Sequence, residues 1–103
     1  MKLTPRDSDR LTVFMIAELA RKRRGRGLKL GHPEAVAYIC DEMHEAARDG
    51  LTYDEVTGLG ASCLTADDVM SGVPEMVPIL HLEVMFADGT KLVTVRNPIR
   101  ASS

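Results

Sequence analysis

The sequence contains no tryptophan and only four aromatic residues in total, two Tyr and two Phe, among 103 positions. Proteins that bind single-stranded nucleic acid usually stack the bases on several aromatic side chains, and this chain has too few for such a platform. Basic residues are not in excess either, since 15 Asp and Glu outnumber 13 Lys and Arg and the net charge is -2. Duplex-binding domains are usually basic on one face. The overall composition therefore indicates no nucleic-acid partner.

Cysteine and long apolar runs are scarce as well. The two cysteines, Cys40 and Cys63, form no C-x-x-C pair, which is typical of buried free thiols in a reducing compartment. The most apolar N-terminal window, residues 11–20, includes Thr12 and Glu18 and is too short to span a bilayer, and no cleavable signal pattern precedes it. We therefore expect a cytoplasmic protein that neither crosses a membrane nor is secreted.

Capping residues, prolines and glycines divide most of the chain into helices. Its length predicts a single domain, residues 1–103, with a small core. Thr4-Pro5-Arg6-Asp7 has the pattern of a capped helix start, and Thr52-x-x-Glu55 and Thr65-x-x-Asp68 repeat the capping box. The predicted helices cover residues 5–24, 33–48, 53–59 and 66–71.

Two of these helices have an apolar side at helical spacing. The first helix carries Leu11, Phe14, Met15 and Leu19, which predict one apolar face, and the second has a buried stripe that includes Val36, Ile39, Cys40 and Met43. Each such face must pack against another element of the fold. We expect the helices to cover one face of the strands that follow.

Asp88-Gly89 lies between two apolar-rich runs and predicts a β-hairpin with strands at residues 79–87 and 90–96. A type I′ turn at these two residues sets the register. Phe86 would then face Lys91, Val84 would face Val93 and Leu82 would face Val95, which makes one face apolar. The predicted fold class is α+β: a bundle of three to four helices followed by a C-terminal antiparallel two-stranded β-hairpin.

The other face of the predicted hairpin is mixed. It places His81 opposite Arg96 and Met85 opposite Leu92. Two strands alone are marginal in water, and an apolar pair on the outer face indicates that something covers it. We therefore predict a subunit interface that includes His81, Met85, Leu92 and Arg96.

The residues that bear chemistry are dispersed. The best local candidate for a metal or acid–base site is Asp41-x-x-His44 with Glu45 alongside, because residues at i and i+3 share one side of a helix. Such residues more often form a solvated face or a helix–helix salt bridge. We predict no catalytic, metal-binding or cofactor-binding residue in this chain. An independent enzyme that uses Asp41, His44 and Glu45 is an alternative hypothesis.

A basic run, Arg21 to Arg26, holds five of the thirteen Lys and Arg. Cations at a helix C-terminus are favoured by the helix dipole, so the run reads as a solvated last turn or as a set of salt-bridge donors. A second functional hypothesis follows from the same residues. A small adaptor could bind RNA or another acidic partner through this run.

Several segments resemble the γ subunit of bacterial urease along essentially the whole chain. They are Leu3-Thr4-Pro5-Arg6, Arg26-Gly27-Leu28-Lys29-Leu30, Pro33-Glu34-Ala35-Val36-Ala37, Ala47-Arg48-Asp49-Gly50, Leu64-Thr65, Val69-Met70, Gly72-Val73-Pro74-Glu75-Met76, Pro78, Asp88-Gly89-Thr90-Lys91-Leu92-Val93-Thr94-Val95 and Asn97-Pro98-Ile99. The resemblance implies a subunit of a cytoplasmic enzyme that hydrolyses urea to ammonia and carbamate, which decays to bicarbonate.

The resemblance also implies partners and a division of labour. The two nickel ions and the catalytic residues of that family belong to the large α subunit, so no metal ligand carries over to this chain and it would bind no cofactor itself. The γ chain packs with α and β subunits into a heterotrimer, usually repeated three times around a threefold axis. A non-catalytic structural subunit is the function that the resemblance implies.

Overall fold

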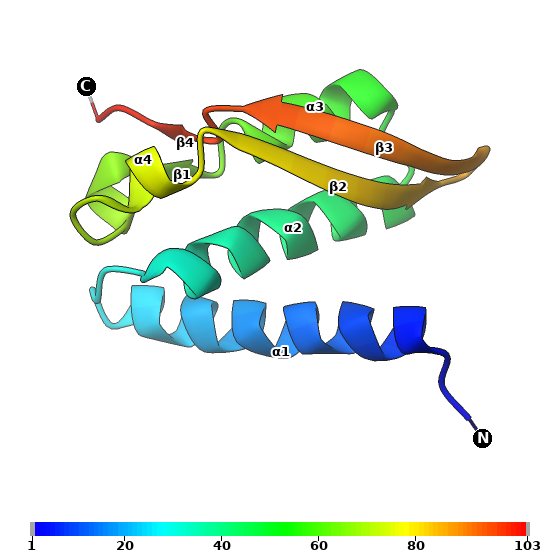
Figure 1. Ribbon diagram of the computed structural model, residues 1–103, viewed down its shortest axis with the longest axis horizontal. Coiled ribbons are helices and arrows are strands. Elements are labelled where there is room, and N and C mark those ends of the chain that lie inside the picture. The colour runs from blue at the N-terminus through cyan, green and yellow to red at the C-terminus, as the bar shows by residue number, and fades with distance from the viewer. Residues whose placement is uncertain (1, 103) are drawn as a thin grey trace.

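The computed structural model describes residues 2–102, and Figure 1 shows them stacked in layers. Helix α1 (Pro5–Gly25) is outermost and helix α2 (His32–Arg48) lies next to it. Helix α3 (Tyr53–Gly60) and the hairpin of β2 (Ile79–Phe86) and β3 (Gly89–Arg96) contact the other side of α2. The short elements are β1 (Leu64–Thr65), a 3-10 turn η1 (Ala66–Asp68), α4 (Val73–Met76) and β4 (Ile99–Arg100). The predicted α+β fold class is confirmed.

The three main helices agree with the predicted ranges 5–24, 33–48 and 53–59 to within one residue at each end. The starts of α1 and α3 are fixed by the expected capping boxes. The Thr4 side chain accepts from the Asp7 backbone N–H at 3.1 Å, and the Thr52 amide donates to Glu55 Oε1 at 2.9 Å. Each box satisfies helix N–H groups that lack a partner within the helix.

Residues 66–71 are not the helix that the third capping box predicts. The box itself forms, since the Thr65 amide donates to Asp68 Oδ2 at 2.8 Å, but the helical turn stops at Asp68. Val69 then takes an extended conformation and pairs with Leu30 in a parallel bridge. The bridge buries Val69 to 2% exposure. Tertiary pairing and burial therefore override the local signal.

The hairpin forms at the predicted place, but its register is shifted by two positions. Phe86 pairs with Gly89, Val84 with Lys91 and Leu82 with Val93, so Ala87 and Asp88 make the turn. A type I′ turn at Asp88-Gly89 would need a positive φ at both residues. In the observed hairpin Asp88 has no positive φ, and Gly89, the first residue of β3, has a φ of 126°.

The shift changes partners but not faces, because two positions are one full period of a strand. Leu80, Val84, Val93 and Val95 stay on the inner side and are buried. On the outer side His81 pairs with Thr94, not with Arg96, and Met85 pairs with Thr90, not with Leu92. The predicted Met85–Leu92 and His81–Arg96 pairs are therefore wrong.

Gly89 provides the first testable prediction. Gly89→Ala is expected to lower the free energy of unfolding by about 1–2 kcal/mol, because an L side chain is strained at this φ. Gly25→Ala is the matched control, since its Cβ would meet nothing within 4 Å and Gly25 lies in a helix. The control is expected to be neutral or slightly stabilising. Urea unfolding of both variants measures the difference, and equal midpoints would contradict the prediction.

A second, two-stranded pairing was not predicted from the sequence. β1 and β4 pair in parallel, with Leu64 opposite Ile99 and Thr65 opposite Arg100. Arg100 Nε also donates to the Ala61 carbonyl at 2.7 Å. The pairing buries Leu64 and Ile99 in the same cluster as the inner hairpin face and the buried side of α2. Residues near the end of the chain therefore complete the core.

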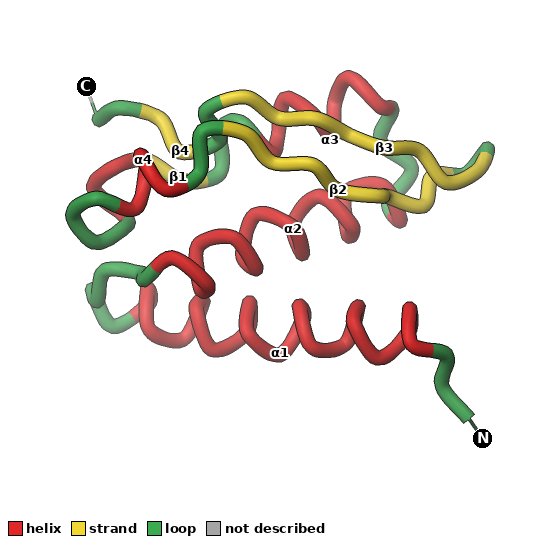
Figure 2. The backbone as a smooth tube through the Cα atoms, in the orientation of Figure 1, coloured by secondary structure: helices red, strands yellow, loops and turns green. Residues whose placement is uncertain are grey.

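The apolar residues predicted on α1 do not enter the core. Leu11, Phe14, Met15 and Leu19 are between 42% and 62% exposed, whereas Ala17 and Ala20 are fully buried. The expectation that the helices cover one face of the hairpin is met by α2 and α3, and this face of α1 takes no part in it. Figure 2 shows α2 between α1 and the strands. The buried residues of α1 are the small Ala17 and Ala20. Among residues 2–102 no helix is long and apolar enough to cross a membrane.

Candidate functional site

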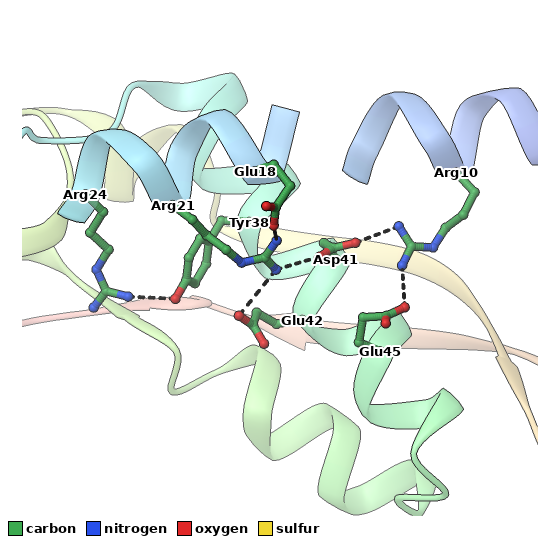
Figure 3. Close-up of polar contacts among 8 residues, drawn as sticks. All are labelled: Arg10, Glu18, Arg21, Arg24, Tyr38, Asp41, Glu42 and Glu45. Carbon is green, nitrogen blue, oxygen red and sulfur yellow. Dashed lines mark hydrogen bonds and ion pairs between the residues drawn. The ribbon is translucent and has the colours of Figure 1, made fainter. Parts of the chain in front are cut away.

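The most deeply buried charged group lies between α1 and α2. The Asp41 side chain on α2 is 1% exposed and accepts from two arginines of α1. Arg10 Nη1 donates to Oδ1 at 2.7 Å and Arg21 Nη2 donates to Oδ2 at 2.5 Å. Figure 3 shows the carboxylate between the two guanidinium groups. Both carboxylate oxygens are therefore occupied by charge-assisted hydrogen bonds.

The two arginines keep the Asp41 carboxylate ionised. Burial opposes its charge, but the hydrogen bonds and charges of Arg21 and Arg10 outweigh burial and lower the pKa of Asp41 below its ordinary value. The pKa of Arg21 shifts in the opposite direction. Burial disfavours the Arg21 charge, but Asp41 and Glu18 outweigh that effect and raise its pKa. The Asp41 carboxylate and the arginines that bind it are thus all charged, and their opposite charges offset one another.

The Asp41 cluster is part of a longer row of contacts between α1 and α2. Arg23 pairs with Glu34 at 2.6 Å, and Arg24 donates to the Tyr38 hydroxyl at 2.7 Å. At the other end Arg10 Nη2 reaches Glu45 at 2.9 Å. The α2 partners in order are Glu34, Tyr38, Asp41 and Glu45, which lie on one side of the helix. The row holds two antiparallel helices in one register.

The predicted trio Asp41, His44 and Glu45 is not brought together as an acid–base or metal site. Asp41 and Glu45 are bound to Arg10. His44 is half-buried, and its pKa is lowered by burial and by the Arg10 charge. No group of three or more His, Cys, Asp and Glu among residues 2–102 is placed to hold a metal ion. The helix–helix salt bridge that competed with the catalytic hypothesis is the arrangement found.

Three residues of the basic run Arg21 to Arg26 form ion pairs within the chain. Arg21 and Arg23 pair as described, and Arg24 Nη2 also lies 3.3 Å from Asp68 Oδ1. Lys22 and Arg26 are exposed, and within residues 2–102 neither has a carboxylate within salt-bridge distance. The run therefore presents two uncompensated cations instead of five, which weakens the hypothesis of an adaptor for RNA or an acidic partner.

Both cysteines are free thiols in apolar surroundings, as expected. Cys40 is buried and Cys63 is half-buried. Burial is the largest influence on each and raises the pKa of each thiol to about 11. Since the thiolate is the reactive form, neither residue is suited to nucleophilic catalysis at neutral pH.

These thiols give a second prediction. In the folded chain at pH 8 both should react with a disulfide reagent at least roughly 100-fold more slowly than in urea, because a pKa of about 11 leaves roughly one thiolate in a thousand. Cys63 should react before Cys40, since it is less buried. Cys40→Ser and Cys63→Ser variants assign the two phases. Modification of the folded chain at the unfolded rate would contradict the prediction.

The four predicted interface residues lie on the outer face of the hairpin. Met85 and Leu92 are 65% and 57% exposed, and His81 and Arg96 are also exposed. His81 Nδ1 lies 3.0 Å from Thr94 Oγ1. The Tyr53 hydroxyl of α3 donates to the Leu92 carbonyl of β3 at 3.1 Å, and its ring lies 5.9 Å from that of the buried Phe86. The outer face is thus exposed and mixed: Met85 and Leu92 lie among the polar residues His81, Glu83, Thr90 and Thr94.

A groove of about 780 Å³ lies between the first half of α1, the end of α2 and β2. Val13, Leu82 and Met85 line its apolar part, with His44 and Asp9 among its polar residues. Arg6 Nη2 reaches Glu83 Oε2 at 3.4 Å between α1 and β2. Both side chains of this ion pair are exposed, so the pair contributes little to stability. Nothing in the sequence pattern pointed to the groove, because its walls come from three distant segments.

A family model described as "Urease, gamma subunit" matches residues 1–99. A protein of Natronomonas pharaonis named "Urease subunit gamma" is 54% identical over 103 residues, which cover all of this chain and 94% of that protein. The chain belongs to the urease gamma subunit family. The resemblance stated from the sequence is confirmed over the full length.

A urease gamma subunit is a structural part of urease, the enzyme that hydrolyses urea, and it has partners in that complex. The predicted function and enzyme class are therefore confirmed at this level. Urease is a nickel enzyme, and residues 2–102 of this gamma subunit do not fit a nickel site, since they offer no suitable group of ligands. The exposed surfaces, not a catalytic pocket, are the candidate functional regions.

Proposed function

We propose that this chain is the non-catalytic γ subunit of a cytoplasmic urease and packs with α and β subunits into an αβγ heterotrimer that is repeated three times around a threefold axis. The full-length match to the gamma family is the observation that carries the proposal. The α subunit would hold the two nickel ions and the catalytic residues. The role of this chain is to contribute contact surface to the assembly.

The proposed contact surface is the outer hairpin face with His81, Met85, Leu92 and Arg96. Two features support it. Met85 and Leu92 are large apolar side chains left more than half exposed on a rigid sheet. The inner side of the same strands is already buried against α2 and α3. The other face of an antiparallel sheet can be left to water, so the exposed apolar side chains of Met85 and Leu92 are what favour a partner there.

The assembly is tested by purifying a tagged copy of this chain together with its partner subunits. We expect a large complex that contains nickel and hydrolyses urea, whereas the isolated chain with added nickel should show no turnover. The native mass tests the threefold arrangement. Recovery of a lone monomer under conditions that preserve other assemblies would contradict the proposal. Turnover by the isolated chain would contradict its non-catalytic role.

The interface gives a third prediction. Met85→Lys and Leu92→Lys are expected to reduce recovery of the partner subunits at least tenfold, because a desolvated lysine replaces an apolar contact. The thermal midpoint of the isolated chain should change little, since both side chains are mostly exposed. Met85→Leu is the matched control and should retain association. If folding and association fall together, the face belongs to the internal core and the proposed interface is wrong.

A further inference from the structure

The outward side of α1 carries an apolar stripe that no described residue covers. Its members are Leu11, Phe14, Met15 and Leu19, with exposed fractions of 47%, 42%, 62% and 44%. Intervals of three and four positions place them on one side of the helix. The α2 side of α1 is occupied separately by Ala17 and Ala20. Figures 1 and 2 show α1 as the outermost element, on the opposite side of α2 from the hairpin.

The stripe does not serve the fold of this chain. None of its four residues belongs to the core cluster or to the half-buried residues packed against it. Single exposed apolar residues are ordinary on protein surfaces, but four large ones in one row mark an interaction site. The stripe is also preorganised, because the α1–α2 ion pairs hold the helix in place. A partner that binds here orders no new backbone.

The positive charges at one end of the stripe indicate which groups its partner surface carries. Lys22 lies seven residues after Met15, and Arg26, the C-cap residue, lies seven after Leu19, so each row of the stripe ends in a cation. These are the two members of the basic run without a carboxylate partner among residues 2–102. The complementary surface is therefore apolar, with carboxylates at the edge that meets the end of α1.

A second copy of this chain fits the stripe less well. In an antiparallel pair of α1 helices, Lys22 and Arg26 would meet the first turn of the other copy, where the Asp7 carboxylate is already held by the Thr4 amide and hydroxyl. The cations would stay uncompensated.

We propose that the α1 stripe, together with Lys22 and Arg26, binds an apolar surface edged by carboxylates on a partner subunit of the urease complex. The inference rests on the proposed function, which supplies such a partner. It adds a second contact surface on the side of the molecule opposite the hairpin. It also gives a role to the part of the basic run that the fold does not use.

The test uses the tagged chain co-expressed with its partner subunits. A Met15→Lys, Leu19→Lys double variant is expected to reduce partner recovery at least tenfold. Lysine has nearly the helix propensity of Met and Leu, so the thermal midpoint of the isolated chain should be retained. Met15→Leu is the matched control and should keep wild-type recovery. In a second arm, Lys22→Glu with Arg26→Glu should weaken association several-fold and reduce its dependence on salt.

The outcomes separate this inference from the proposed function. If the wild-type chain recovers its partners and the double lysine variant recovers them equally well, the inference fails and the proposed function stands. If the wild-type chain recovers no partner, both fail. If sedimentation shows a dimer of the isolated chain that the double variant abolishes, while partner recovery is unchanged, the occupant is a second copy and the inference is overturned.

Discussion

Replacing Asp41 with asparagine is expected to lower the free energy of unfolding by about 2–4 kcal/mol. The substitution keeps the shape of the side chain but removes the charge that compensates Arg10 and Arg21. Loss of one member of a fully buried ion pair costs about 3–5 kcal/mol, and the partial exposure of the two arginines reduces that cost here. Urea unfolding at pH 7 measures the change.

The pH dependence of the Asp41→Asn effect identifies its origin. Because the folded-state pKa of Asp41 lies below its ordinary value of 3.8, its ionised form stabilises the fold fully above that pH. The stabilisation is lost as the pH falls through the folded-state pKa. The difference between wild type and variant should therefore shrink progressively below about pH 4. Asp49→Asn, an exposed change at the end of the same helix, should cost little at any pH. A difference that does not vary with pH would indicate that packing, not charge, is responsible.

Gly60→Val is the second change with a large expected effect, a loss of about 2–3 kcal/mol. Gly60 of α3 faces α2 and β3. A Cβ there would lie 2.7 Å from Met43 Sδ and 3.1 Å from Val95 Cγ2. Both neighbours are buried to 1% exposure or less, so neither can move into solvent. The substitution therefore forces a rearrangement of packed side chains.

Gly58→Val is the matched control for Gly60→Val. Gly58 lies on the same helix, and a Cβ at that position would meet nothing within 4 Å. Valine has a higher helix propensity than glycine, so the control should be neutral or slightly stabilising. Thermal unfolding of the two variants separates the steric effect from the helix effect. Similar midpoints would show that the contact at Gly60 relaxes at little cost.

The sequence predicted those features of the fold that depend on local chemistry. The capping boxes at Thr4 and Thr52 fix helix starts through contacts three residues apart, and these were located correctly. The faces of the hairpin were also correct, because alternation of apolar residues survives an even shift in register. The exact partners depend on the turn. In the structure Asp88 has no positive φ, so the Asp88-Gly89 pair does not form the expected type I′ turn.

The features that failed depend on contacts between distant segments. The β1–β4 pair consists of two residues in each strand, which is too short for any periodic signal. The apolar spacing of α1 was recognised, but spacing cannot say whether a face is covered by the same chain or by another. The spacing of the α2 partners Glu34, Tyr38, Asp41 and Glu45 on one side of a helix could have been recognised from the sequence. It meets a matching row of arginines on α1, which indicates helix pairing only when both rows are considered together.

The β1–β4 pairing has a consequence for how the chain is made. α1 and α2 contact each other across a short connection, as do β2 and β3, so both pairs can form soon after they are synthesised. Ile99 is the last residue of the core cluster to leave the ribosome, and the β1–β4 pairing of Leu64 with Ile99 cannot form before then. Until then the Leu64 side of the core stays open. The nascent chain therefore presents unfinished apolar surface until β4 emerges.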